Sequence, residues 1–145
     1  MCGIVGYTGS QEAAPILLEG LKKLEYRGYD SAGIAVFDNN KIKVVKCQGK
    51  LENLVGRMAD EGKPEGTCGI GHTRWATHGG VLKKNAHPHR CGKVTFVHNG
   101  IVENYRQLIE DYELQEQLVS ETDTEVVAAL LNHYYEGDAK KAIQQ

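Results

Sequence analysis

Residues 1–7 read MCGIVGY, in which a cysteine directly follows the initiator methionine and an apolar run lies between two glycines. Short apolar runs bounded by glycine are typical of buried strands, so we expect a strand over 2–9. The place of the cysteine has a second consequence. If Met1 is removed, Cys2 becomes the N-terminal residue of the chain.

An N-terminal cysteine carries two reactive groups on one residue. Its thiol has an ordinary pKa of about 8.5 and its α-amino group one of about 7.7–8.0, so the amine can accept the thiol proton near neutral pH. The alternative is that Cys2 is a small buried side chain of a core strand, as cysteine often is. Taken alone, Cys2 favours this second interpretation.

Working outward from the first strand, apolar spacing predicts a helix over 11–26 that ends before Gly28. Two apolar runs on either side of a turn-rich linker at 38–40 predict a hairpin. The remaining expected elements are a helix over 51–60, strands over 68–74 and 93–100, a helix over 102–111 and a further helix begun in the tail at 137–145. Between the last two we expect a helix that Thr122 or Asp123 caps. Its inner face would carry Val126, Val127, Leu130 and Leu131. Strands and helices come in blocks, which favours a layered α+β architecture.

Composition narrows the class of function. The 145 residues are 41% hydrophobic and 25% charged, with a formal net charge of −2, so no basic field exists to hold nucleic acid or an anionic membrane. A small-molecule partner is therefore favoured. No apolar run is long enough to span a bilayer and no secretion signal is evident, so we expect a cytoplasmic protein with reduced thiols.

The segment 75–92 is rich in His, Gly and Asn, and we expect it to be a long functional loop outside the core. His87, His89 and Cys91 invite a metal-binding interpretation, but they lack a second paired set of ligands. We therefore expect no metal and no cofactor, and we keep a metal-binding domain as a weaker alternative. His72 and His98 lie on predicted strands.

Three short stretches carry candidate chemistry. In HTRWATHG (72–79), the planar guanidinium of Arg74 could form two parallel hydrogen bonds to a carboxylate, although a lone arginine more often makes a surface ion pair. In VHNG (97–100), the Asn99 side chain and the Gly100 N–H can pair as oxyanion donors, although Asn-Gly is also a common hairpin turn. In SETDTE (120–125), Asp123 could receive an ammonium group or cap a helix.

Together, six blocks resemble the glutaminase domain of the glucosamine-forming branch of the class II glutamine amidotransferases. They are MCGIVGY, LEYRGYDSAGIAV, GHTRWATHG, NAHPH, VHNGIVEN and SETDTE, in this order. Other class II amidotransferases share the opening Cys-Gly-Ile and an Asn-Gly, whereas RGYDSAG and HTRWATHG point to the glucosamine-forming branch. The resemblance implies the N-terminal nucleophile hydrolase fold, a four-layer αββα sandwich.

The resemblance also implies roles for named residues. It implies that Cys2 is the nucleophile with its own α-amino group as base, and that Asn99 and Gly100 are the oxyanion donors. It also implies that Arg74 and Asp123 hold the carboxylate and ammonium of L-glutamine, with Thr77 and His78 lining the same pocket. Arg27 would order the region around the nucleophile, and Trp75 would lie at the mouth of the pocket. A chain that retains Met1 would lack the amine base.

The implied activity is hydrolysis of the glutamine γ-amide through a thioester, with ammonia delivered to fructose-6-phosphate in a longer, homo-oligomeric enzyme. Residues 1–145 would form a glutaminase domain that is incomplete at its C-terminal end and lacks the sugar-isomerase domains that bind fructose-6-phosphate. Two alternatives remain open: a non-catalytic glutamine-binding module, which unprocessed Met1 would favour, and another class II amidotransferase.

Overall fold

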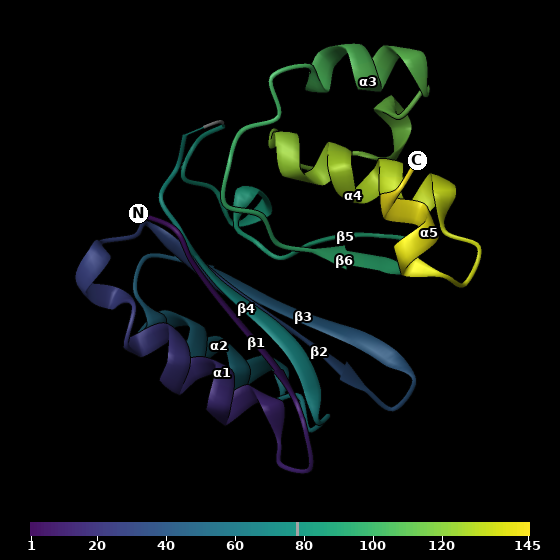
Figure 1. The fold of residues 1–145 in the computed structure, drawn as a ribbon. Helices are drawn as coiled ribbons and strands as arrows, with labels where there is room; N and C mark the ends of the chain where they lie inside the picture. Colours follow the sequence, from purple (N-terminus) through teal and green to yellow (C-terminus); the bar gives the residue numbers. More distant parts are fainter. Residues whose placement is uncertain (78) are drawn as a thin grey trace.

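The computed structural model describes residues 1–77 and 79–145. The strand expected at the start of the chain, β1 (Gly3–Thr8), lies antiparallel to β4 (Cys68–Arg74), with Gly3 opposite Thr73. The sheet order is β1-β4-β2-β3, which makes β4 an inner strand. The end of β4 therefore lies beside the start of β1 (Figure 1).

The predicted hairpin is confirmed as β2 (Ser31–Asp38) and β3 (Lys41–Gln48). Asn39 and Asn40 connect the two strands with φ values of 47° and 60°. Asparagine tolerates this left-handed backbone better than most residues, and two such residues in succession match the right-handed twist of a hairpin. The turn is thus encoded locally.

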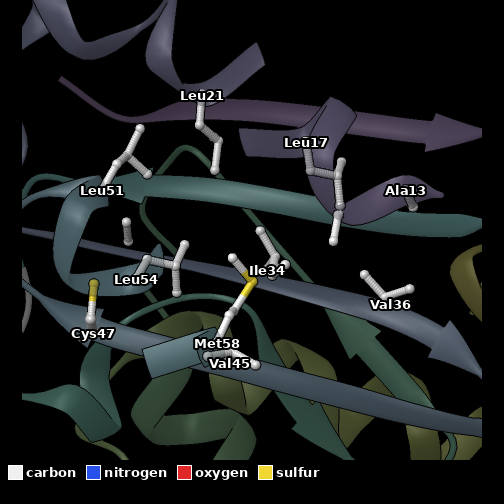
Figure 2. Close-up of a cluster of buried hydrophobic side chains, with 12 residues drawn as sticks. Ala13, Leu17, Leu21, Ile34, Val36, Val45, Cys47, Leu51, Leu54 and Met58 are labelled. Atoms are coloured by element: carbon white, nitrogen blue, oxygen red, sulfur yellow. The ribbon is translucent and has the colours of Figure 1, made fainter. Parts of the chain in front are cut away.

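Two helices, α1 (Ala13–Lys22) and α2 (Leu51–Glu61), cover one face of this sheet (Figure 1). Figure 2 shows the apolar core between these helices and the strands. Its buried members are Ala13, Ala14, Leu17, Leu21, Ala32, Ile34, Val36, Val45, Cys47, Leu51, Leu54 and Met58. Burial of this apolar surface is the main term that holds the helices on the sheet.

A second, two-stranded sheet lies against the opposite face and is formed by β5 (His89–Cys91) and β6 (Val94–Phe96). The helices α3 (Tyr105–Asp111), α4 (Asp123–Tyr134) and α5 (Ala139–Ile143) form the outer layer beyond it (Figure 1). Among the described residues there are also three 3₁₀ turns, namely η1 (Glu25–Arg27), η2 (Lys83–Asn85) and η3 (Gln115–Gln117). The layers run helix, sheet, sheet, helix, so the expected layered α+β architecture is confirmed.

Some predicted boundaries were wrong. The first helix ends at Lys22 rather than at residue 26, because Leu24 N–H bonds to the Leu21 carbonyl and the chain tightens into η1 before Gly28. The strand expected over 93–100 is reduced to β6, since residues beyond Phe96 leave the sheet and carry Asn99 toward Cys2. α5 confirms the helix expected in the tail.

The expected inner face of α4 was also wrong in part. Val126 is buried, whereas Val127, Leu130 and Leu131 are half-buried, and the other buried apolar positions are Ala128 and Ala129. The small alanines let the helix approach β5 and β6 closely, so they occupy the face that the larger side chains were expected to fill.

The expectation that residues 75–92 lie outside the core was wrong in part, because the described residues up to Lys84 are exposed or half-buried whereas several of those after it are buried. Asn85, His87 and His89 are at most 5% exposed. The Asn85 side chain is satisfied, because its Oδ1 accepts from the Glu121 N–H and its Nδ2 donates to the Gly80 carbonyl. Gly33 gives the segment room, since a Cβ there would lie 2.2 Å from the His87 carbonyl oxygen. Within the described residues, no helix is long and apolar enough to cross a membrane.

Candidate functional site

The antiparallel register places Cys2 beside the residues that follow β4. The Cys2 Sγ accepts a hydrogen bond from the Trp75 N–H at 3.3 Å and lies 3.7 Å from the Trp75 carbonyl oxygen, to which the thiol can donate. Gly3 permits this close packing, because a Cβ at that position would lie 2.7 Å from Leu24 Cδ1 and 2.9 Å from Thr73 Oγ1. Cys2 is half-buried and reachable from a pocket.

This pocket gathers residues from widely separated parts of the chain. Its lining is Cys2, Arg74, Trp75, Thr77, His87, His98, Gly100, Thr122, Asp123 and Thr124. Six of the nine residues to which the resemblance gave roles are among them. Of the other three, Asn99 contacts Cys2 directly, Arg27 contributes a backbone carbonyl nearby, and His78 lies outside the described residues.

Asn99 and Gly100 follow β6 and form one side of the site. The Asn99 Nδ2 donates to the Cys2 carbonyl oxygen at 3.2 Å, and its Oδ1 lies 2.7 Å from His72 Nε2. Gly100 has no room for a side chain, because a Cβ would lie 2.6 Å from His98 Nε2. A backbone N–H and a side-chain amide, both next to a cysteine, are the groups that an oxyanion hole requires.

Arg74 and Asp123 supply the charges of the pocket. Arg74 is only 4% exposed, so the alternative of a surface ion pair was wrong, and its guanidinium donates to the Gly80 carbonyl at 3.3 Å. Asp123 is the first residue of α4 and 5% exposed. Its Oδ2 accepts from the Val102 N–H at 2.7 Å and its Oδ1 from the Thr124 N–H at 3.0 Å.

The helix cap is Thr122, whose Oγ1 accepts from the Glu125 N–H, so the interpretation of Asp123 as the cap was wrong. A carboxylate in the first turn of a helix is stabilised by the helix dipole. Because each carboxylate oxygen accepts more than one hydrogen bond, Asp123 keeps capacity for an ammonium group. The pocket thus pairs a buried cation with a buried carboxylate, as the ends of an α-amino acid require.

The N-terminal ammonium lies on two backbone carbonyls. Met1 N donates to Arg27 O at 3.1 Å and to Gly28 O at 2.8 Å. The Arg27 side chain is exposed and stacks on Tyr26, so its backbone rather than its guanidinium meets the N-terminus. Trp75, which is 54% exposed, packs beside Gly28 at the rim of the pocket.

Asp30 also belongs to the site, although the sequence did not lead us to expect it there. Its Oδ2 accepts from the Ala76 N–H at 2.6 Å, and its backbone N–H donates to the Arg74 carbonyl at 2.8 Å. Asp30 therefore holds the backbone on both sides of Trp75 against Cys2. The sequence did carry a signal for this role, because Asp30 directly precedes a strand and aspartate side chains at such positions often accept hydrogen bonds from backbone N–H groups.

Three imidazoles are buried in and behind the wall of the pocket, and one of them, His87, lines it. The rings of His72 and His87 stack with centroids 4.1 Å apart, and the His89 ring meets His87 edge-on at 4.7 Å. Removal from water disfavours the charged form of each ring. Burial lowers the pKa of His72 to about 4 and that of His89 to about 3, and it lowers the pKa of His87 further still.

These lowered pKa values predict acid sensitivity. The unfolded histidines have a pKa of 6.5, so between pH 6.5 and about 4 the unfolded chain binds protons that the folded chain does not. The stability that the neutral buried imidazoles give to the folded chain is therefore complete above pH 6.5 and is lost as the pH falls. We expect the free energy of unfolding to drop by about 1 kcal/mol per pH unit for each buried imidazole, measured by urea unfolding between pH 7.5 and 5.

The control compares two glutamine substitutions. His89→Gln should flatten this pH dependence because it removes a buried imidazole, whereas His133→Gln, at an exposed position, should leave it unchanged. A free energy of unfolding that does not change between pH 7.5 and 5.5 would contradict the lowered pKa values of the buried imidazoles.

Within the described residues, no group of three His, Cys, Asp or Glu side chains is arranged to hold a metal ion. The residues considered as ligands have other contacts. His89 Nε2 lies 3.0 Å from Thr122 Oγ1, and Cys91 Sγ lies 3.5 Å from Gln117 Oε1.

Comparison with known proteins places this geometry in a family. Residues 38–142 match the family described as glutamine amidotransferase domain. The chain is 54% identical over 146 residues to a Clostridium tetani protein named glutamine–fructose-6-phosphate aminotransferase (isomerizing), covering 99% of this chain and 24% of that protein. A Thermus thermophilus protein of the same name is 51% identical over 148 residues, covering 100% of this chain and 24% of that protein.

Two solved structures are similar in fold. One is described as the allosteric regulatory enzyme of purine biosynthesis, with a TM-score of 0.80 and 31% identity, covering 99% of this chain and 32% of that one. The other is glutamine phosphoribosylpyrophosphate amidotransferase from B. subtilis complexed with ADP and GMP, with a TM-score of 0.77, 30% identity and the same coverage. The chain spans about a quarter of the length of the curated relatives it matches. It belongs to the family of glutamine amidotransferase domains and has their α+β, N-terminal nucleophile hydrolase fold.

Proposed function

We propose that this chain hydrolyses the γ-amide of L-glutamine, with Cys2 as the nucleophile after Met1 has been removed. The observation that carries the proposal is that Cys2, Gly100, Arg74 and Asp123 line one pocket although they lie far apart in sequence. Arg74 meets the α-carboxylate and Asp123 the α-ammonium, which leaves the side-chain amide directed at Cys2. Thr77 and Trp75 line the approach, whereas a role for His78 is implied by the resemblance alone.

In the first half of the reaction, the Cys2 α-amino group takes the thiol proton and the sulfur attacks the amide carbon. Negative charge develops on the carbonyl oxygen, where the Asn99 Nδ2 and the Gly100 N–H donate to it. The amine returns the proton to the leaving nitrogen. The carbon–nitrogen bond then breaks, which releases ammonia and leaves a γ-glutamyl thioester on Cys2.

In the second half, a water molecule gives a proton to the same amine and attacks the thioester carbon. The oxyanion forms again at Asn99 and Gly100. Cleavage of the carbon–sulfur bond returns the thiol and releases glutamate. The two halves use the same donors because both pass through a tetrahedral intermediate at the same carbon.

We further propose that this domain belongs to a longer glutamine–fructose-6-phosphate aminotransferase, in which sugar-isomerase domains bind fructose-6-phosphate and receive the ammonia. The names and the identity of the relatives support this proposal. A cytoplasmic location, assembly into a homo-oligomer and an incomplete glutaminase domain over 1–145 are parts of the same proposal.

The direct test is labelling with a diazoketone analogue of L-glutamine, which alkylates a cysteine that attacks it. We expect one adduct, mapped by peptide mass to Cys2 in chains that lack Met1. L-Glutamine should protect against it.

The chain contains its own controls. Cys68 is exposed, whereas Cys47 and Cys91 are buried and burial raises the pKa of both thiols. Iodoacetamide, which needs no pocket, should modify Cys68, while the glutamine analogue should spare it. Equal labelling of Cys68 and Cys2, or none at a free N-terminal Cys2, would contradict the proposed function.

A further inference from the structure

His72 meets the proposed oxyanion donor from behind. It lies in the inner strand β4, is 0% exposed, and places its Nε2 at 2.7 Å from Asn99 Oδ1. On its other side, the Asn99 amide approaches the Cys2 carbonyl oxygen at 3.2 Å. The Asn99 side chain therefore lies between a ring nitrogen and a backbone acceptor.

These two neighbours fix which way the amide points. A carbonyl oxygen cannot donate, so the Asn99 atom facing Cys2 must be the NH₂ group and the atom facing His72 must be the oxygen. His72 must then donate from Nε2. Because burial lowers the pKa of His72 to about 4, the ring is neutral at pH 7 and carries its single proton at that nitrogen.

The ring is itself held in place. His87 stacks on it with an interplanar angle of 16°, His89 packs edge-on against His87, and His89 Nε2 lies 3.0 Å from Thr122 Oγ1. Gly33, the strand partner of His72, leaves room for the His87 backbone. The imidazole stack thus runs from the oxyanion side of the pocket to the cap of α4, next to Asp123.

We propose that His72 is a positioning residue that locks the Asn99 amide with its nitrogen toward the reacting carbonyl of the substrate. The inference rests on the proposed function, because it assigns the orientation of one of its oxyanion donors. The amide nitrogen carries two hydrogens, so one can bond to Cys2 O while the other meets the oxyanion. Without His72, rotation of the amide would direct its oxygen at the developing negative charge, which opposes the reaction.

The test compares two replacements of His72 in the protein that carries this chain. His72→Phe keeps an aromatic ring to stack on His87 but has no donor, so Asn99 Oδ1 loses its partner. We expect kcat for glutamine hydrolysis to fall by about 10- to 100-fold with KM nearly unchanged. His72→Gln can place an amide N–H near the position of Nε2 and should restore most of kcat.

A double-substitution cycle separates positioning from a general loss of structure. Once Asn99→Ala has removed the amide, adding His72→Phe should cost less than threefold more in kcat, because His72 acts only through Asn99. Equal losses from His72→Phe with and without Asn99 would overturn the inference. So would an unchanged kcat in His72→Phe when the unmutated protein is active.

One measurement does not depend on turnover or on folding of a variant. In the ¹⁵N NMR spectrum of the unmutated protein at pH 7.5, we expect the neutral His72 ring protonated at Nε2, with a pyridine-type nitrogen at Nδ1. A proton at Nδ1 would overturn the inference alone. An unmutated protein that neither hydrolyses glutamine nor is labelled at Cys2 would overturn the proposed function, and the inference with it.

Discussion

A chain released with Met1 still attached is expected to hydrolyse no measurable glutamine, whereas the chain released with Cys2 first is expected to be active. In the first form, the nitrogen of Cys2 is part of a peptide bond and cannot accept the thiol proton. The free α-amino group then belongs to Met1 and bonds to the carbonyls of Arg27 and Gly28. The base that the proposed mechanism uses is therefore missing.

Two fusions to a cleavable N-terminal domain make the comparison. In one the protease cuts before Met1, and in the other before Cys2, so the products differ by a single residue. Glutamate release is then measured at pH 7.5, with the melting temperature of each product as the control for folding. Equal rates from the two products would show that the α-amino group is not the base.

Asn99→Ala is expected to lower kcat for glutamine hydrolysis by about 100- to 1,000-fold, the usual cost of removing one oxyanion donor. The effect should fall on kcat rather than on KM, because the oxyanion exists only in the transition state and the tetrahedral intermediates. Since Asn99 is exposed, the substitution removes little packing and the protein should remain folded.

Asn104→Ala is the matched control. Asn104 is an exposed asparagine only five positions away, and its side chain makes no capping hydrogen bond at the start of α3. Its replacement should leave kcat and KM unchanged. A kcat of Asn99→Ala within threefold of that of the unmutated protein would contradict the assignment of Asn99 as an oxyanion donor.

Local features of the chain were predictable from the sequence. The hairpin follows from two apolar runs and the Asn39–Asn40 turn, and Thr122 is a capping residue with its partner N–H three positions ahead. The position of Cys2 behind Met1 made it a candidate nucleophile, but only the resemblance to a family favoured this role over that of a buried side chain. Long continuous blocks of sequence carried the resemblance to the amidotransferase family, which the comparisons confirm.

Other features depend on contacts between distant segments. Polarity led residues 75–92 to be assigned to an exposed loop, yet His87 and His89 are buried, because Gly33 on a different strand admits the His87 backbone and Thr122 bonds to His89. In the same way, β6 ends early because Asn99 reaches back to Cys2.

The residue types and turns of this protein therefore specify its helices, strands and hairpin turn, since propensity, capping and apolar spacing act over a few residues. The pairing of Cys2 with Trp75, the orientation of Asn99 on His72 and the lowered pKa values of the imidazoles exist only in the folded chain. Strand register and burial bring these groups together from positions up to 97 residues apart, and exclusion of water then sets their charge.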